Sequence, residues 1–365
     1  MVADADIDAR WMERALESAR RGLGRTTPNP LVGACVVSPD GVVVGQGAHE
    51  RAGDAHAEVH ALDEAGAAAR GATLYCTLEP CAHTGRTGPC TSRIIAAGIR
   101  RVVAAMGDPF PQVNGRGFAL LRAHGIDVAV GVGHESAVRL NQPFLTSVRD
   151  GRPFVILKAA SSIDGRISAR PGMRTALTSA AALRRAQYDR AWVDAVGVGS
   201  ETILVDDPLL TVRELYRERP LTRVIFDRRL RTPATARIFS TLADGPIVVL
   251  TTEAALRAKA PDASRLAAAG ATVVAPATAG IDAAFRALHA REIQSIVIEG
   301  GSALHSAVWD ARLADYVQLY VAPTAVGEAG VPLEGQAFST SGLFDRRVDA
   351  LGPDVLVEGY VHRPH

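Results

Sequence analysis

Two short runs place the strongest constraint on how this chain can fold: His56-Ala57-Glu58, and Pro80-Cys81 followed by Cys90. His56 offers an imidazole nitrogen and the two cysteines offer thiolates, a donor set that suits zinc. Three protein ligands leave the fourth tetrahedral position to water, as in catalytic zinc sites, and the metal lowers the pKa of that water towards ~7. Glu58 is then free to move protons between the water and a leaving amine. The pattern predicts a fold that brings these residues to one catalytic zinc site.

The first part of this pattern is shared with zinc-dependent nucleobase deaminases, in which His-x-Glu is followed by Pro-Cys-x-x-Cys. The second part differs, because eight residues rather than two separate Cys81 from Cys90. A non-enzymatic zinc module joined to a nucleotide-binding sensor is the alternative interpretation, and it requires a fourth protein ligand. Cys76 and His83 are the nearby candidates for that ligand. A site closed by either residue would exclude the catalytic interpretation.

Length and charge limit the classes of protein to which the chain can belong. It has 365 residues, more than the ~100–200 of a usual domain, which favours two domains. Its 40 basic and 39 acidic residues give a net charge of +1, which argues against a nucleic-acid partner because such binding needs a basic face. The acidic amino terminus is unlike a signal peptide, and no apolar run approaches the ~20 residues of a membrane span. We expect a soluble, cytoplasmic protein with no nucleic-acid or membrane partner.

Helix and strand signals alternate from the amino terminus to about residue 150. Apolar side chains recur with helical spacing between Asp8 and Arg21, and Pro39-Asp40-Gly41 predicts a hairpin turn. An alanine-rich helix is expected to begin at His56, so that His56 and Glu58 lie in its first turn. Strands are expected at residues 31–37, 42–47, 72–78, 101–106 and 126–132. This alternation predicts a layered α/β domain.

A polar, turn-rich stretch from Leu145 to Pro153 predicts the boundary between two domains, at residues 1–149 and 150–365. A second α/β pattern begins directly after it. Its strands are expected at residues 154–160, 194–199, 224–227, 246–251, 271–275, 295–299, 316–322 and 355–361. None of them is followed by a strict Gly-x-Gly-x-x-Gly. The glycines Gly300-Gly301 after the 295–299 strand are interpreted either as a phosphate-binding turn or as an ordinary turn into a helix.

Longer runs around these motifs resemble the bifunctional deaminase/reductase family of riboflavin biosynthesis, and the resemblance extends over nearly the whole chain. The matching runs are residues 27–33, 56–62 and 77–90 in the first domain, and residues 158–166, 194–213 and the run around Glu299 in the second. The resemblance implies a cytidine-deaminase-like domain followed by a domain like dihydrofolate reductase. It implies zinc and NADPH as cofactors, a phosphoribosylaminopyrimidine as substrate, and a homo-oligomer, either a dimer or a tetramer.

The resemblance also implies roles for individual residues. Zinc would be bound by His56, Cys81 and Cys90, with Glu58 as the catalytic proton carrier. The deaminase substrate would contact Asn29, His49, Arg86 and Asp108. NADPH would contact Ala160, Thr202, Asp206, Gly301 and Ser302, and the reductase substrate would contact Arg190, Leu210, Arg213 and Glu299. A plain alternative stays open for three of these residues: Asn29 as a cap of its own turn, and His49 and Arg86 as solvated loop side chains.

Two departures from the family pattern bear on function. Phe110 stands where the family usually has an Asn, and it cannot make an amide contact with a substrate. Arg174 and Ala176 stand where the family commonly has Ser and Trp. Arg174 is interpreted as a substrate-phosphate contact; the alternative is an active deaminase with a weak or degenerate reductase domain. A nucleic-acid base deaminase with an appended domain is a further alternative, which the balanced charge disfavours.

Overall fold

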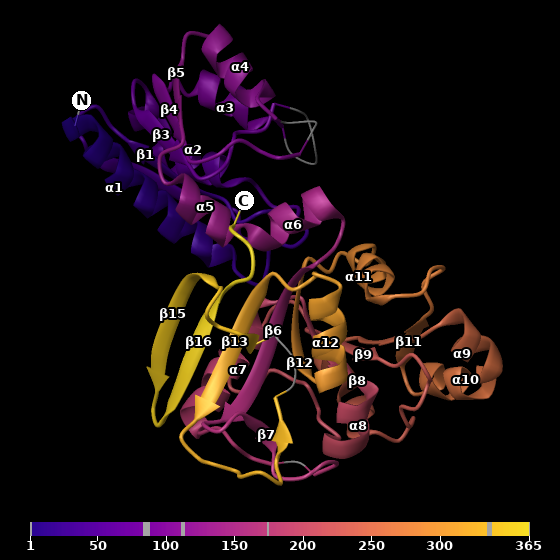
Figure 1. Cartoon of the computed structure of the whole chain (residues 1–365). Coiled ribbons are helices and arrows are strands. Elements are labelled where there is room, and N and C mark those ends of the chain that lie inside the picture. Colours follow the sequence, from indigo (N-terminus) through magenta and orange to yellow (C-terminus); the bar gives the residue numbers. More distant parts are fainter. Residues whose placement is uncertain (1, 83–87, 111–113, 174, 334–337, 365) are drawn as a thin grey trace. The chain divides into compact units, whose positions relative to one another are not determined.

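The computed structural model describes residues 2–82, 88–110, 114–173, 175–333 and 338–364. The chain divides into two compact units (Figure 1). The first unit consists of Met1–Asp150 with Pro364–His365, and the second of Gly151–Arg363. Each unit contains a sheet with helices packed against it, so each has its own hydrophobic core.

The first unit is built on a five-stranded sheet with the order β2-β1-β3-β4-β5. Its strands are β1 (Gly33–Val37), β2 (Val43–Ala48), β3 (Thr73–Cys76), β4 (Arg101–Ala104) and β5 (Asp127–Val130). β1 pairs antiparallel with β2 and β3, while the β3–β4 and β4–β5 pairs are parallel. The central strands β1, β3 and β4 are almost entirely buried, which explains why their sequences are short apolar runs without polar alternation.

The helices of the first unit are α1 (Val2–Ala19), α2 (Ala57–Ala65), α3 (Cys90–Ala96), α4 (Arg116–Ala123), α5 (His134–Leu140) and α6 (Gln142–Asp150), with short 3-10 turns η1 (Arg20–Gly22) and η2 (Gly66–Ala69). The contact of α2 with β2 is unusually close. A Cβ atom added at Gly45 would lie 2.1 Å from the Ala61 carbonyl oxygen, and one at Gly47 would lie 2.1 Å from that of Ala57. Only glycine permits this approach, which fixes the start of α2 against the sheet.

The second unit is built on a nine-stranded sheet with the order β11-β10-β9-β8-β12-β6-β13-β16-β15. Its strands are β6 (Phe154–Ser162), β8 (Ala195–Gly199), β9 (Thr222–Phe226), β10 (Ile247–Leu250), β11 (Ala271–Val274), β12 (Ser295–Gly300), β13 (Tyr316–Ala322), β15 (Phe344–Leu351) and β16 (Asp354–Tyr360). Neighbours from β11 to β13 are parallel, whereas β16 and β15 complete one edge in antiparallel pairs (Figure 1). The chain runs outward from β8 to β11 and then returns to β12, between β8 and β6. Ligands of open α/β sheets bind where the strand order reverses in this way, at the carboxyl ends of β8 and β12.

The parallel strands of this sheet carry buried apolar clusters on both faces. Val224 and Val248 belong to one buried apolar cluster, whereas their chain neighbours Ile225 and Val249 belong to another. Successive side chains of a strand point to opposite faces, so the two clusters lie on the two sides of the sheet.

The helices of this unit are α7 (Ala180–Trp192), α8 (Ser200–Asp206), α9 (Glu253–Ala258), α10 (Ala260–Ala268), α11 (Ile281–His289) and α12 (Ser302–Asp310). The unit also contains a 3-10 segment, η3 (Arg237–Asp244), and a separate strand pair, β7 (Arg166–Ser168) and β14 (Val331–Pro332).

The structure confirms the five strands expected in the first unit and the eight expected in the second, with shifted ends. One expectation is wrong, and one strand of the large sheet was not predicted. The stretch after Leu145 is not a turn but the second half of α6, because Leu145 is buried in the core and its packing overrides the weak helix propensity of the polar residues around it. The strand β15 was missed because nearly all of its side chains are exposed, so its sequence lacks alternation; pairing with β16 makes it a strand.

Candidate active sites

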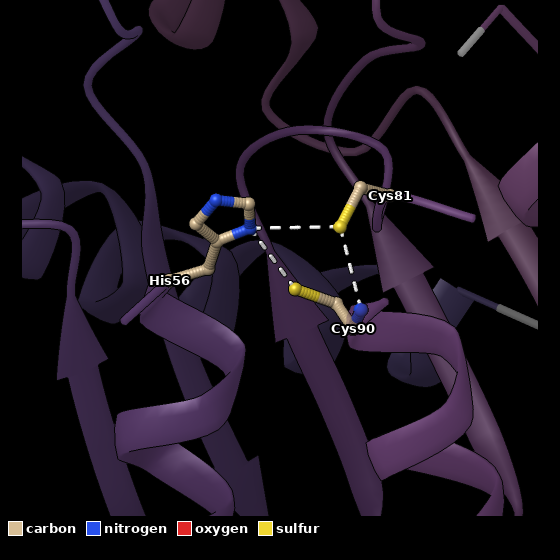
Figure 2. Close-up of side chains that lie close together, drawn as sticks. All are labelled: His56, Cys81 and Cys90. Atoms are coloured by element: carbon tan, nitrogen blue, oxygen red, sulfur yellow. Dashed lines mark hydrogen bonds between the residues drawn. The ribbon is translucent and has the colours of Figure 1, made fainter. Parts of the chain in front are cut away.

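Three side chains of the first unit converge at the starts of two helices (Figure 2). His56 is the N-cap of α2, Cys90 is the first residue of α3, and Cys81 lies on the loop before α3. His56 Nδ1 lies 3.1 Å from Cys90 Sγ and 3.6 Å from Cys81 Sγ, and the three ligand atoms lie within 4.8 Å of one another. The three proposed metal ligands therefore face one point, and Nδ1 is the imidazole atom that faces it.

This donor set fits a zinc ion. Tetrahedral zinc with N and S ligands places its ligand atoms about 3.5 Å apart, close to the separations found here. Cys76 does not join the group, since its buried thiol points to the Val103 carbonyl oxygen, 3.8 Å away. His83 lies outside the described residues. Among the residues that the structure describes, the group consists of His56, Cys81 and Cys90.

The pKa values of the three proposed ligands depend on one another. The hydrogen bond from the Cys90 thiol outweighs burial and, with a smaller contribution from His56, lowers the pKa of Cys81 to about 4. The Cys81 sulfur and burial raise the pKa of Cys90, and the hydrogen bond to Cys81 raises the pKa of His56. Metal binding must therefore release protons from this cluster.

Glu58 lies in the first turn of α2 and is 3% exposed. Burial raises its pKa, and its carboxyl group has a hydrogen bond with Cys90. Glu58 is not a member of the ligand group, which agrees with its proposed role. A carboxyl group whose pKa is raised holds a proton more readily than an ordinary glutamate, which suits a group that must accept and return one.

The predicted substrate contacts Asn29 and His49 lie together beside the metal site. His49 Nδ1 is 3.2 Å from the Ala55 carbonyl oxygen, so this nitrogen carries the proton and donates it. Nε2 is then an acceptor for the Asn29 amide, whose Nδ2 is 3.0 Å away. Burial lowers the pKa of His49, and the ring makes an edge contact with His56 at a centroid distance of 5.5 Å. His49 is 2% exposed, which excludes the solvated-loop alternative.

The buried side-chain amide of Asn141, which is distant in sequence, holds the loop that carries Asn29. The Leu31 N–H donates to Asn141 Oδ1 at 2.8 Å, and Asn141 Nδ2 donates to the Leu31 carbonyl at 3.0 Å. The same Nδ2 also donates to the Ala137 carbonyl at 3.3 Å. Asn141 is 2% exposed, so these bonds replace water that cannot reach it. Because its partner is the backbone of a loop more than a hundred residues away, no local sequence signal points to this role.

We expect the substitution Asn141→Leu to raise the KM of deamination and to destabilise the first unit by about 1–3 kcal/mol, since it leaves buried backbone groups of Leu31 without partners. Steady-state kinetics and thermal unfolding measure the two effects. The control is Ser18→Ala, because the buried Ser18 hydroxyl donates to the Arg14 carbonyl at 3.1 Å within its own helix, α1. An unchanged KM in Asn141→Leu would show that the loop does not need this anchor.

The remaining predicted deaminase contacts are less defined. Asp108 Oδ1 accepts the Phe110 N–H at 2.8 Å and thereby stabilises its own turn. The Phe110 side chain is 42% exposed. Arg86 lies outside the described residues. Asp108 stays a proposed contact, with a local structural role in addition.

In the second unit, a cavity of about 240 Å³ lies beside α7 and the carboxyl end of β12. It is lined by four of the predicted substrate contacts, Arg190, Leu210, Arg213 and Glu299. Four basic side chains and two carboxylates line the cavity, a balance that suits an anionic ligand. Arg174, the fifth predicted contact, lies outside the described residues.

Glu299 organises the charges of this cavity. Its carboxylate makes a two-point contact with the Arg190 guanidinium, with Nη2 2.7 Å from Oε2, and lies 3.8 Å from Lys158 Nζ. Burial would raise the pKa of Glu299, but Arg190 and Lys158 outweigh it and lower the pKa to about 2. Arg190 also donates to the Thr211 carbonyl at 3.0 Å, which ties α7 to the segment that carries Leu210.

The proposed cofactor contacts lie at the switch point of the sheet rather than in this cavity. The turns that follow β8 and β12 are adjacent: a Cβ added at Gly300 would lie 2.9 Å from Thr202 Oγ1. Gly301 has φ +88°, which favours glycine, and Ser302 begins α12. Gly301 is the N-cap of α12, and the N–H groups of a helix start can bind a phosphate, so the residues present fit a dinucleotide. Ala160 lies on β6, and Asp206 ends α8.

Comparison with known proteins decides between the possible families. Residues 5–106 match the model of the cytidine and deoxycytidylate deaminase zinc-binding region, and residues 153–357 match the RibD C-terminal domain. The riboflavin biosynthesis protein RibD of Escherichia coli is 41% identical over 88% of this chain and 89% of that protein, and the one of Aquifex aeolicus is 39% identical over 88% and 89%. The chain belongs to the RibD family.

Solved structures of RibD proteins agree with this assignment over the full length. RibD of Acinetobacter baumannii is 36% identical with a TM-score of 0.86, and covers 98% of this chain and 100% of its own. A Thermotoga maritima diaminohydroxyphosphoribosylaminopyrimidine deaminase/5-amino-6-(5-phosphoribosylamino)uracil reductase is 35% identical with a TM-score of 0.84, and covers 99% of this chain and 100% of its own.

RibD membership confirms the expected fold classes and functions. The chain is a bifunctional enzyme of riboflavin biosynthesis with a zinc-dependent deaminase domain and an NADPH-dependent reductase domain. The alternatives of a nucleic-acid base deaminase and of a structural zinc module are thereby excluded, and no finding favours a degenerate reductase. No helix in the described part of the chain is long and apolar enough to cross a membrane.

Three charged side chains that line the RibD reductase cavity were not predicted: Lys158, Asp207 and Arg237. Lys158 lies in a run that carries the family resemblance, but a lysine in a predicted strand does not by itself indicate a binding site. Its place in the site follows from the structure, in which its Nζ lies 3.8 Å from the Glu299 carboxylate. Asp207 has φ +41°, a left-handed conformation that is uncommon for a side chain other than glycine. Its Oδ1 accepts the Arg237 N–H at 2.8 Å, so the two residues form one wall of the cavity.

Proposed function

We propose that the first domain hydrolyses the 2-amino group of 2,5-diamino-6-(5-phosphoribosylamino)pyrimidin-4-one. The second domain then reduces the ribosyl group of 5-amino-6-(5-phosphoribosylamino)uracil to a ribityl group. The observation that carries this proposal is the convergence of His56, Cys81 and Cys90 beside Glu58, in a chain whose relatives include an enzyme named for these two reactions.

In the deamination, the water oxygen forms a bond to the ring carbon, the carbon–nitrogen bond breaks, and ammonia leaves. Zinc bound by the proposed ligands supplies Lewis-acid activation of water at neutral pH. Glu58 accepts a proton from the attacking water and delivers it to the leaving amine. Asn29 and His49 would orient the heterocycle, because their hydrogen bond fixes both side chains beside the His56 ring.

In the reduction, a hydride adds to C1′ of the ribosyl group, the bond between C1′ and the ring oxygen breaks, and that oxygen gains a proton. NADPH supplies the hydride, so the chain's residues bind and orient rather than react. Arg213 and Arg237 would hold the phosphate at the rim of the cavity, and Glu299 keeps Arg190 in place at its wall.

We expect Arg213→Gln to raise the KM for the phosphorylated uracil substrate by about 10–100-fold, since a hydrogen bond to a charged group is worth about 1.5–3 kcal/mol. The Kd of NADPH should stay unchanged, because the proposed cofactor contacts lie outside this cavity. Arg184→Gln is the matched control, as Arg184 is exposed on α7 and does not line the cavity. Equal KM values for the two variants would refute the phosphate role of Arg213.

The test of the proposed function is an assay of the purified protein that follows ammonia release and NADPH oxidation separately. The diaminopyrimidine substrate should release ammonia with no NADPH present. The deaminated uracil should oxidise NADPH with no ammonia released. Ammonia release from free cytidine but not from the diaminopyrimidine would refute the substrate assignment.

Two further expectations belong to this proposal. A homo-oligomer, dimer or tetramer, is supported by β15, which is an edge strand of the sheet in the described part of the chain and has almost all of its side chains exposed, since edge strands can pair with another chain. Sedimentation analysis measures the oligomeric state.

A cytoplasmic location is supported by the four cysteines, none of which forms a disulfide, as suits a reducing compartment.

A further inference from the structure

Glu79, which the function described above does not use, has an unusual environment. It lies two residues before the proposed ligand Cys81 and is 3% exposed. Its Oε1 accepts the N–H groups of Gly117 at 2.9 Å and Phe118 at 3.4 Å. Its Oε2 accepts those of Gly115 at 2.9 Å and Asp108 at 3.3 Å. Within the described part of the chain, no Lys or Arg pairs with this carboxylate. Four backbone donors satisfy it in place of a cation.

These four donors come from one segment that follows β4. Asp108 begins this segment, and Gly115 is the N-cap of α4. The first turn of α4 also touches the metal loop directly, since a Cβ added at Gly117 would lie 2.0 Å from the Pro80 carbonyl oxygen. A side chain there would push Pro80, and with it Cys81, away from α4. Glu79 and Gly117 thus both contribute to one junction, the contact between the loop at Pro80-Cys81 and the start of α4.

We infer that Glu79 is a positioning residue for deamination, which fixes the loop of the metal ligand Cys81 and the segment of the substrate contact Asp108 relative to each other. An ionised carboxylate can accept all four N–H groups at once, and helix N-termini favour a negative charge. A glutamine keeps the size of the side chain but has one acceptor oxygen, and its NH₂ group would face two N–H donors. The substitution therefore loosens the junction without removing any group that touches zinc or substrate.

The inference rests on the proposed deaminase function and predicts a pattern that general destabilisation does not produce. In Glu79→Gln, zinc affinity should fall by about 10–100-fold, as for other partners that orient metal ligands. The KM of deamination should rise about tenfold, whereas kcat at saturating zinc and substrate should stay near the parent value, because Glu58 is intact. NADPH oxidation with the deaminated uracil should be unchanged, which shows that the second domain is folded.

The matched control is Asp8→Asn. Asp8 is another buried carboxylate of the same domain. It accepts from Tyr75 at 2.8 Å and from Arg101 at 2.8 Å, and it lies on α1, far in sequence from the Cys81 loop. The Asp8→Asn variant should melt at a lower temperature than the parent, and its zinc affinity and its KM of deamination should be unchanged. A competition titration with a zinc chelator, thermal unfolding and steady-state kinetics provide the readouts.

Gly117→Ala provides the second test, because the added Cβ would lie 2.0 Å from the Pro80 carbonyl oxygen and 3.2 Å from Glu79 Oε1, and so disturbs the junction while the Glu79 carboxylate itself is kept. The same loss of zinc affinity and rise of KM in this variant support the inference. Parent-like zinc affinity and KM in Glu79→Gln would overturn the inference. Equal effects of Glu79→Gln and Asp8→Asn would also overturn it, because they would assign Glu79 a purely structural role. Loss of the first domain's melting transition in Glu79→Gln would lead to the same conclusion. If the parent protein itself releases no ammonia, the proposed function fails instead.

Discussion

Replacing Glu58 with glutamine should lower the rate of deamination by about 10²–10⁴-fold, the usual contribution of a general acid–base group. Glutamine is nearly the same size but cannot accept and return a proton. Zinc content should stay at the parent level, because Glu58 is not a member of the ligand group. Ammonia release and metal analysis of the purified variant measure the two effects.

Stability offers an independent check on this variant. Burial raises the pKa of Glu58, so ionising the carboxyl group opposes folding once the pH exceeds its value in the unfolded chain. Glutamine removes this cost, and the metal-free variant should melt at the same temperature as the parent or higher at neutral pH. The uracil intermediate should be reduced at the parent rate, because the reductase residues belong to a separate unit. Loss of zinc together with deamination would mean that Glu58 is a ligand.

Cys81→Ser should remove both the metal and deamination. The parent should hold about one zinc per chain, and the variant should lose zinc affinity by more than about 100-fold, because removing even an outer partner of a ligand costs about 10–100-fold. The serine hydroxyl stays protonated at neutral pH, whereas the pKa of the Cys81 thiol is lowered to about 4, so only cysteine offers an anionic donor there. Metal analysis after dialysis and ammonia release measure the outcome.

The chain contains its own controls for this substitution. Cys35 and Cys76 are fully buried in β1 and β3, and neither belongs to the ligand group. Cys35→Ala and Cys76→Ala should keep the zinc ion and most of the activity, at some cost in stability from lost packing. A chelator should reproduce the Cys81→Ser result in the parent protein, and added zinc should restore activity. Full metal occupancy in Cys81→Ser would show that the ligand assignment is wrong.

The metal group could be predicted from the sequence because zinc accepts only a few kinds of donor atom. His56, Cys81 and Cys90 supply such donors at a distinctive spacing. The structure brings the three together as expected. Prediction was weaker wherever a role depends on partners distant in sequence. Lys158 gained a role only from its approach to Glu299, and Asn141 only from its pairing with the Leu31 backbone.

The sequence by itself predicted the two α/β domains from the periodicity of apolar residues, and the proposed metal ligands from donor chemistry, because both are local properties of the chain. The family, the substrate class and NADPH followed from the resemblance of longer runs to the riboflavin-biosynthesis family. Tertiary structure decided how those groups are held. It showed that His56 Nδ1 faces the sulfurs, that Arg190 is paired with Glu299, and that the Glu79 carboxylate joins the metal loop to the start of α4. Each of these depends on hydrogen bonds between segments that are far apart in the chain, and such pairings exist only once the fold has excluded water from both partners.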